Sequence, residues 1–174
     1  MPINYWFAIL ALVICVGLVF GAAKGGTRKV QKAQNRADPV IVARWELLLA
    51  ESQPALFKRA KKKNIHFGAS IIFYLASIVL MFASFYVASR YDDLGLFQFS
   101  CVAFGLLALV NIVTYRQYFT VRRQLLQHVP AEHPGIPDKF VADKQLIVAK
   151  TSNNMSYYFL SMFFLMVAAL LLTI

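Results

Sequence analysis

The sequence predicts an all-α integral membrane protein with four transmembrane helices, and two observations support this class. The 174-residue chain is 59% hydrophobic and only 15% charged, whereas a soluble domain carries about a quarter charged residues. The charged residues are also segregated, because four apolar stretches contain no Asp, Glu, Lys or Arg. Each stretch has the roughly 20 residues that a helix needs to cross a bilayer. The stretches are Asn4–Ala23, Phe67–Ser89, Leu94–Thr114 and Met155–Ile174.

The first stretch has an alternative reading as a cleavable signal peptide, because Gly21-Ala22-Ala23 would suit cleavage. The residues before it contain no Lys or Arg, and a signal peptide begins with a basic region. We therefore expect the stretch to be retained as a transmembrane helix. Cys15 and Cys101 lie inside predicted spans, so we expect buried thiols rather than a disulfide.

The basic residues predict the orientation of the chain. The net charge is +10, and 17 of the 18 Lys and Arg residues lie after the first stretch and before the second, or after the third and before the fourth. By the positive-inside rule these segments are cytoplasmic, so both termini face the periplasm of a bacterial inner membrane. The predicted parts are an outer N-terminus and first span (1–23), a basic cytoplasmic segment (24–66), the second and third spans with a short outer turn at 90–93 (67–114), a second cytoplasmic segment (115–154) and the fourth span (155–174).

Two of the spans continue beyond the membrane. No helix breaker interrupts Pro54–Ser89 or Leu96–Val129 except single glycines, which membrane helices tolerate. A short outer turn joins them, so they should form an antiparallel hairpin extended into the cytoplasm. After it, Asp138 is expected to cap a short helix over Lys139–Lys150, although Gln145–Thr151 also suits a strand.

A further helix is predicted in the first cytoplasmic segment. Asp38-Pro39 is typical of a helix start, with Asp as N-cap and Pro at the first position. The helix over Val40–Glu51 is too apolar for a freely solvated one, so it must lie on the membrane, pack on the hairpin or bind a partner. We expect partner docking, with a central Trp as the anchor. The stripe that would dock consists of Ile41, Trp45 and Leu48.

A cluster of cations lies immediately before the second span. Such a cluster contacts anionic lipid headgroups and anchors the topology, and it also suits an acidic soluble protein. Nucleic acid is not expected, because no aromatic residues alternate with the cations. The cluster consists of Lys58, Arg59, Lys61, Lys62 and Lys63.

The spans themselves contain two kinds of candidate packing residue. Gly17 and Gly21 form a GxxxG motif, which favours a close helix contact either in a homo-oligomer or within the chain. Gln98 and Asn111 are amides inside the third span. We expect them to hydrogen-bond to a neighbouring helix, and lining a pore is the alternative.

No catalytic, cofactor or metal site is predicted. The sequence has no P-loop, GxSxG or HExxH motif. His128, Glu132 and His133 fall around a proline-containing turn without a recognisable metal-ligand spacing. We therefore expect a protein that is not an enzyme.

Three functional hypotheses follow. The first is a non-enzymatic scaffold or sensor subunit, as in a defence or envelope-associated complex, that oligomerises through its spans and recruits a soluble cytoplasmic partner. The second is an immunity or exclusion protein that acts in the bilayer against a pore-forming toxin or incoming phage. The third is a membrane enzyme or channel whose chemistry leaves no sequence motif.

The topology can be tested with reporter fusions. Fusions at Ile3, Asp93 and Ile174 should report a periplasmic location, and fusions at Asn35 and Gly135 a cytoplasmic one, because the basic segments stay inside. A cytoplasmic signal at Ile174 would contradict the four-span arrangement.

Overall fold

Helices account for every regular element that the structure describes. The computed structural model describes residues 3–24, 38–91, 94–130 and 132–174. Four of its helices are long and apolar enough to span a membrane, which confirms the predicted all-helical class and indicates a multi-pass membrane protein. The stretch 25–37 of the predicted basic segment and the turn residues 92–93 lie outside the described residues. The helices are α1 (Ile3–Lys24), α3 (Pro39–Ser52), α4 (Pro54–Tyr91), α5 (Gly95–Gln127) and α6 (Asp138–Leu171).

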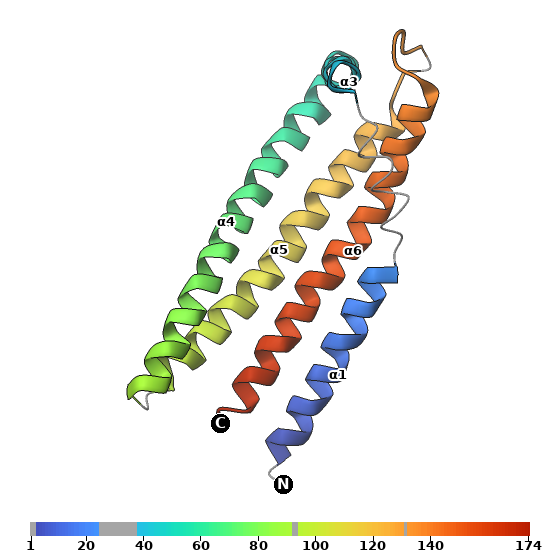
Figure 1. Ribbon diagram of the computed structural model, residues 1–174. Helices are drawn as coiled ribbons and strands as arrows, with labels where there is room; N and C mark the ends of the chain where they lie inside the picture. Colours follow the sequence, from blue (N-terminus) through green and yellow to red (C-terminus); the bar gives the residue numbers. More distant parts are fainter. Residues whose placement is uncertain (1–2, 25–37, 92–93, 131) are drawn as a thin grey trace.

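The four long helices stand side by side in one row, in the order α4, α5, α6, α1 (Figure 1). Along the helix axes, both ends of the chain lie at one end of the helices, and α3 crosses at the opposite end (Figure 1). A row leaves two broad faces uncovered, unlike a closed four-helix bundle. Large apolar side chains such as Ile72, Phe73 and Val79 are about two-thirds exposed on it. This surface suits lipid rather than water.

α4 and α5 are antiparallel and in contact along most of their length. Residues with higher numbers in α4 contact residues with lower numbers in α5, as in any antiparallel pair. The contacts comprise both polar and aromatic pairs. They include Lys63–Gln117, Ser70–Asn111, Tyr74–Phe104 and Phe85–Phe97.

α1 packs against α6 through a face of small side chains. Ala8, Ala11 and Ala22 are buried there, and Cys15 is half-buried between them. Spacings of three, four and seven residues keep these positions on one side of the helix. Small residues let the two backbones approach closely, which is how helices associate in lipid.

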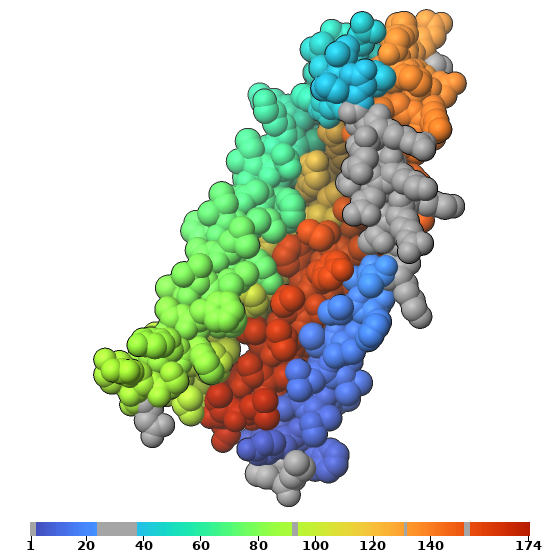
Figure 2. All heavy atoms as spheres, viewed as in Figure 1, coloured from blue at the N-terminus to red at the C-terminus, as the bar shows by residue number. Residues whose placement is uncertain are grey.

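The helix ends that lie beside α3 form a folded unit with it, which we call the head. It comprises α3, residues 54–66 of α4, 115–127 of α5, and the chain from 128 to 150 apart from residue 131. Figure 2 shows α3 gathered with the start of α6 at this end. Trp45, Leu49 and Leu125 are fully buried in its core. The remaining buried members of the core are Ala60, Val121, Leu126, Ile136 and Val148.

Local contacts fix the start of α3 and the turn before α6. The Asp38 carboxylate accepts a hydrogen bond from the Val40 amide at 2.9 Å, which confirms the predicted N-cap. In the turn before α6, Gly135 has φ of 76°, and a Cβ there would lie 2.7 Å from Arg44 Nη1. Gly135 thus combines a left-handed backbone with a close approach of α3.

The segment after this turn differs from the sequence prediction. A short helix over Lys139–Lys150, or a strand over Gln145–Thr151, was expected before the last span. The structure has one continuous helix, α6, with Pro137 at the N-cap and Asp138 in the first turn. The strand alternative is wrong, because no residue between 138 and 171 breaks the helix and Phe140, Val141 and Val148 face the head core.

Burial of Trp45 predicts a strong dependence of head stability on this side chain. Trp45→Ala should destabilise the protein by about 3–5 kcal/mol, because it removes a large side chain from a packed core. Trp45→Phe should cost much less, since the buried indole Nε1 has no hydrogen-bond partner among the described residues. Thermal unfolding of the purified variants measures both effects.

Leu47 supplies the matched control in the same helix, because its side chain is 61% exposed. Leu47→Ala should change the unfolding temperature little. An equal loss from Leu47→Ala and Trp45→Ala would contradict the buried-core assignment.

Candidate functional site: two basic grooves beside the α4–α5 contact

The predicted cluster of cations is divided among different faces of α4. Each helical residue is rotated by about 100° from the one before, so five nearly consecutive cations cannot share one surface. Lys58 and Lys62 are exposed and line neither groove. Lys61, also exposed, lines a groove with Tyr118 and Arg122 of α5. Arg59 and Lys63 share a second face and line a groove with α5. The cluster is therefore not a single docking site.

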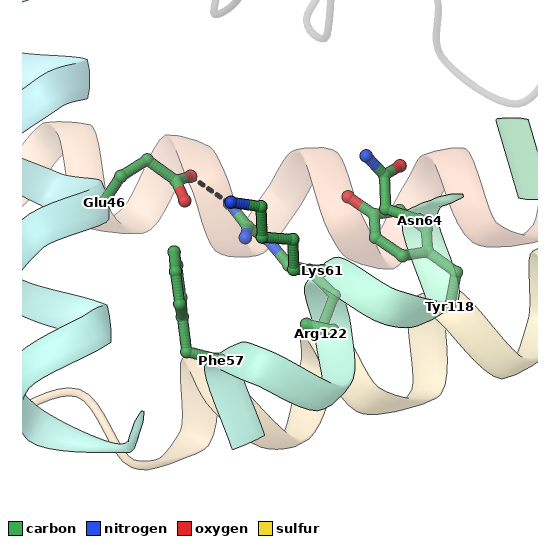
Figure 3. Close-up of a pocket in the computed structure, with 7 residues that line it drawn as sticks. Glu46, Phe57, Lys61, Asn64, Tyr118 and Arg122 are labelled. Atoms are coloured by element: carbon green, nitrogen blue, oxygen red, sulfur yellow. Dashed lines mark hydrogen bonds and ion pairs between the residues drawn. The ribbon is translucent and has the colours of Figure 1, made fainter. Parts of the chain in front are cut away.

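One groove, which we call the Glu46 pocket, opens where α3 meets α4 and α5 (Figure 3). Its volume is about 340 Å³. Glu46 Oε1 accepts a hydrogen bond from Arg122 Nη2 at 2.6 Å, and this ion pair ties α3 to α5. The side chain of Arg122 is 18% exposed and that of Glu46 is 40% exposed. The lining residues are Glu46, Phe57, Ala60, Lys61, Asn64, Tyr118 and Arg122.

A second part-buried cation, Lys144, lies near the same carboxylate. Lys144 lies in the charged N-terminal part of α6, outside the apolar stretch of that helix. Burial lowers the pKa of its ammonium group and neighbouring Arg122 lowers it further, whereas Glu46 raises it. The Lys144 Nζ also lies 5.0 Å from the ring centre of Phe140. Glu46 therefore bonds to Arg122 and lies close enough to Lys144 to offset part of its charge.

The other groove, which we call the three-cation groove, lies on the second face of the α4–α5 contact. Its volume is about 420 Å³. Lys63 Nζ donates a hydrogen bond across it to Gln117 Oε1 at 2.6 Å. No acidic residue lines it. The lining residues are Arg59, Lys63, Arg116, Gln117, Thr120, Val121 and Gln124.

The predicted docking stripe on α3 lies inside the head rather than on its surface. Trp45 is fully buried, and Ile41 and Leu48 are half-buried against the same core. The expectation that Trp45 anchors a partner is wrong, because its ring packs edge-on against Phe140 at 5.9 Å. Among the three alternatives for this helix, packing on the chain's own helices describes the structure.

Both intramembrane amides make hydrogen bonds to another part of the chain. Asn111 is fully buried, its Oδ1 accepts from the Ser70 hydroxyl at 2.8 Å, and Thr114 Oγ1 lies 3.1 Å from the same hydroxyl. Gln98 Nε2 donates to the carbonyl of Thr173 at 3.1 Å. These bonds join α5 to α4 and to the end of α6. They satisfy polar groups that apolar surroundings would otherwise destabilise.

No described residue packs against the two glycines of the GxxxG motif. A Cβ built at Gly17 or Gly21 would meet no atom within 4 Å. The motif lies on a different side of α1 from the buried Ala8 and Ala11. The structure thus excludes intrachain packing through these glycines among the described residues, and leaves their face open.

The two histidines near the turn have local structural contacts. His133 Nδ1 lies 3.0 Å from the Ile136 carbonyl and its Nε2 lies 3.4 Å from Asp138 Oδ1. His128 Nδ1 lies 2.8 Å from the Gln124 carbonyl. Within the described part of the chain, no three His, Cys, Asp or Glu side chains are grouped closely enough to hold a metal ion.

Sequence reasoning missed the α5 partners of both grooves. Arg116 and Arg122 lie in the predicted second cytoplasmic segment, and nothing in the sequence alone pairs them with α4. The signal that identifies them is the antiparallel register: once Ser70 is paired with Asn111, positions a few residues before Ser70 must face positions a few residues after Asn111. That register needs a tertiary contact, which periodicity alone does not supply.

Comparison of the chain with protein families, with curated proteins and with solved structures finds no match.

Proposed function

We propose that this chain is a non-enzymatic scaffold or sensor subunit of the bacterial inner membrane that recruits a soluble cytoplasmic partner to its head. The four apolar helices support a multi-pass topology. The basic residues concentrate at the head end, which favours a cytoplasmic head and periplasmic termini by the positive-inside rule. In this topology the extended parts of α4 and α5 form a hairpin that stands in the cytoplasm.

The observation that carries the proposal is the outward face of α4 in the head. Lys58 and Lys62 are exposed there, with Lys61 at the edge beside the Glu46 pocket, and none of the three forms an ion pair with a described acidic residue. Spacings of three and four residues place the ammonium groups on one surface. Such a surface attracts an acidic partner and speeds its association at low salt. The partner docks on this face. The buried Trp45 acts indirectly, because it stabilises the head that carries the face.

Charge reversal tests recruitment. Lys58→Glu with Lys62→Glu should reduce the yield of a co-purifying soluble partner at least about tenfold, because like charges then repel at the contact. Insertion and unfolding temperature should stay unchanged, since both side chains are exposed. Affinity purification from membranes at low and high salt measures the yield.

The matched control reverses the same number of charges elsewhere on the head. Arg123 and Lys139 are exposed there, so Arg123→Glu with Lys139→Glu should keep the partner. Equal loss in both variants would reduce the effect to net charge. Full biological activity of the Lys58 and Lys62 variant would place the function within the bilayer, as an immunity or exclusion protein requires.

The proposed homo-oligomer uses the open face of α1. Gly17→Ile with Gly21→Ile should lower the oligomer mass in detergent, because added bulk separates two backbones that meet at glycine. The fold of the single chain should be unaffected, since a Cβ at either glycine would meet no atom of another described residue within 4 Å. Mass measurement and thermal unfolding check the two expectations.

The contrasting variant places the same bulk on the other face of α1. Ala8→Ile with Ala11→Ile should lower the unfolding temperature, because both positions are buried against α6. An unchanged mass in the glycine variant of an oligomeric protein would exclude this face as the interface.

A further inference from the structure

The three-cation groove has a charge pattern that the head does not neutralise. Arg59, Lys63 and Arg116 line one groove without an acidic residue. The described ion pairs of the chain, Arg122–Glu46 and His133–Asp138, involve none of them. Three cations that share a groove repel one another, and an anion placed between them offsets that repulsion.

The types of donor in the groove suit a phosphate. Two guanidinium groups present forked N–H donors, and one ammonium group adds a compact charge. The Lys63–Gln117 hydrogen bond holds the ammonium across the groove rather than in solvent. Thr120 adds a hydroxyl to the same lining. This donor set favours a phosphate oxyanion over a single carboxylate.

The groove lies at the level of lipid headgroups in the proposed topology. Arg116 follows the predicted end of the third span at Thr114 by two residues, and Lys63 precedes Phe67 by four. These separations correspond to about 3–6 Å along a helix axis. A phosphodiester at the surface of the cytoplasmic leaflet would therefore meet Arg116 and Lys63 directly. Arg59 lies four residues before Lys63, about 6 Å further from the membrane along the helix axis.

An apolar track leads from the groove toward the membrane. Val113 lies three residues before Arg116 and four before Gln117, so it shares their face of α5. Val110 lies three residues further along the same face. Val113 is 54% exposed and Val110 is 46% exposed. A ligand with a phosphate and an attached acyl chain fits both parts, whereas inorganic phosphate uses only the first.

We propose that the three-cation groove binds an anionic phospholipid of the cytoplasmic leaflet, with the phosphate among Arg59, Lys63 and Arg116 and an acyl chain along Val113 and Val110. The site rests on the proposed topology but is separate from the partner surface, which lies on another face of α4. A lipid bound there joins α4 to α5 at the base of the head.

The test is native mass spectrometry of the full chain in detergent with added phosphatidylglycerol or phosphatidylcholine. The native protein should bind phosphatidylglycerol in preference. Arg59→Gln with Arg116→Gln should weaken that binding at least about tenfold, because two charge-assisted contacts are lost. Arg59→Lys with Arg116→Lys should retain most of the binding, since the charge stays.

The control removes the same number of charges from the neighbouring face. Lys58→Gln with Lys62→Gln should change phosphatidylglycerol binding less than about twofold, because neither residue lines the groove. Equal weakening in the two variants would overturn the site in favour of diffuse attraction. Equal binding of phosphatidylglycerol and phosphatidylcholine by the native protein would overturn it as well.

A competition arm separates a lipid from a free anion. Inorganic phosphate at the same concentration should not displace phosphatidylglycerol, because it lacks the acyl chain that covers Val113. Displacement would make the groove a site for soluble phosphate and overturn the lipid assignment. The readout involves no protein partner, so its failure leaves partner recruitment standing, and the reporter fusions test the shared topology independently.

Discussion

The length of three helices beyond what a bilayer can hold is the constraint on which the rest of the structure depends. α4 has 38 residues, α5 has 33 and α6 has 34, so their axes extend over about 50–57 Å, against a hydrocarbon layer of about 30 Å. α1, with 22 residues, is about 33 Å long and has almost no surplus. The surplus lies at one end of the row, and the head is built from it. The head therefore needs no separate domain, because the spans themselves supply its walls.

Most of the helical framework could be predicted because it depends on local rules. Exclusion of charge from long apolar stretches identifies the spans, and Asp38 with Pro39 identifies the start of α3. The head core could not be predicted in the same way. Trp45, Leu125 and Val148 come from three different helices, α3, α5 and α6, and only the tertiary structure shows that they pack against one another. An apolar helix outside the membrane was interpreted as a docking surface for that reason.

The candidate site shows a related difference between sequence and space. Lys58 to Lys63 form one cluster in sequence, but rotation about the helix sends Arg59 and Lys63 into a different groove from Lys61. The partners that complete each groove, Arg116 on one side and Arg122 on the other, are more than 50 residues away in sequence. Composition predicted a basic head, and only the register of α4 on α5 separates its charges into a neutralised pair, a solvent face and a groove without acids.

The contact of α1 with α6 has a consequence for how the chain is assembled during synthesis. More than 110 residues separate the end of α1 from the start of α6, so α1 enters the bilayer long before its neighbour in the row has been made. It must remain there as a solitary helix, which its lack of charged side chains from Ile3 to Ala23 permits. Contacts between distant segments form late. The small-residue face of α1 therefore has no α6 to pack against until the last helix has been made. A ribosome stalled before α6 should leave α1 free to diffuse laterally in the membrane, tethered only by the chain.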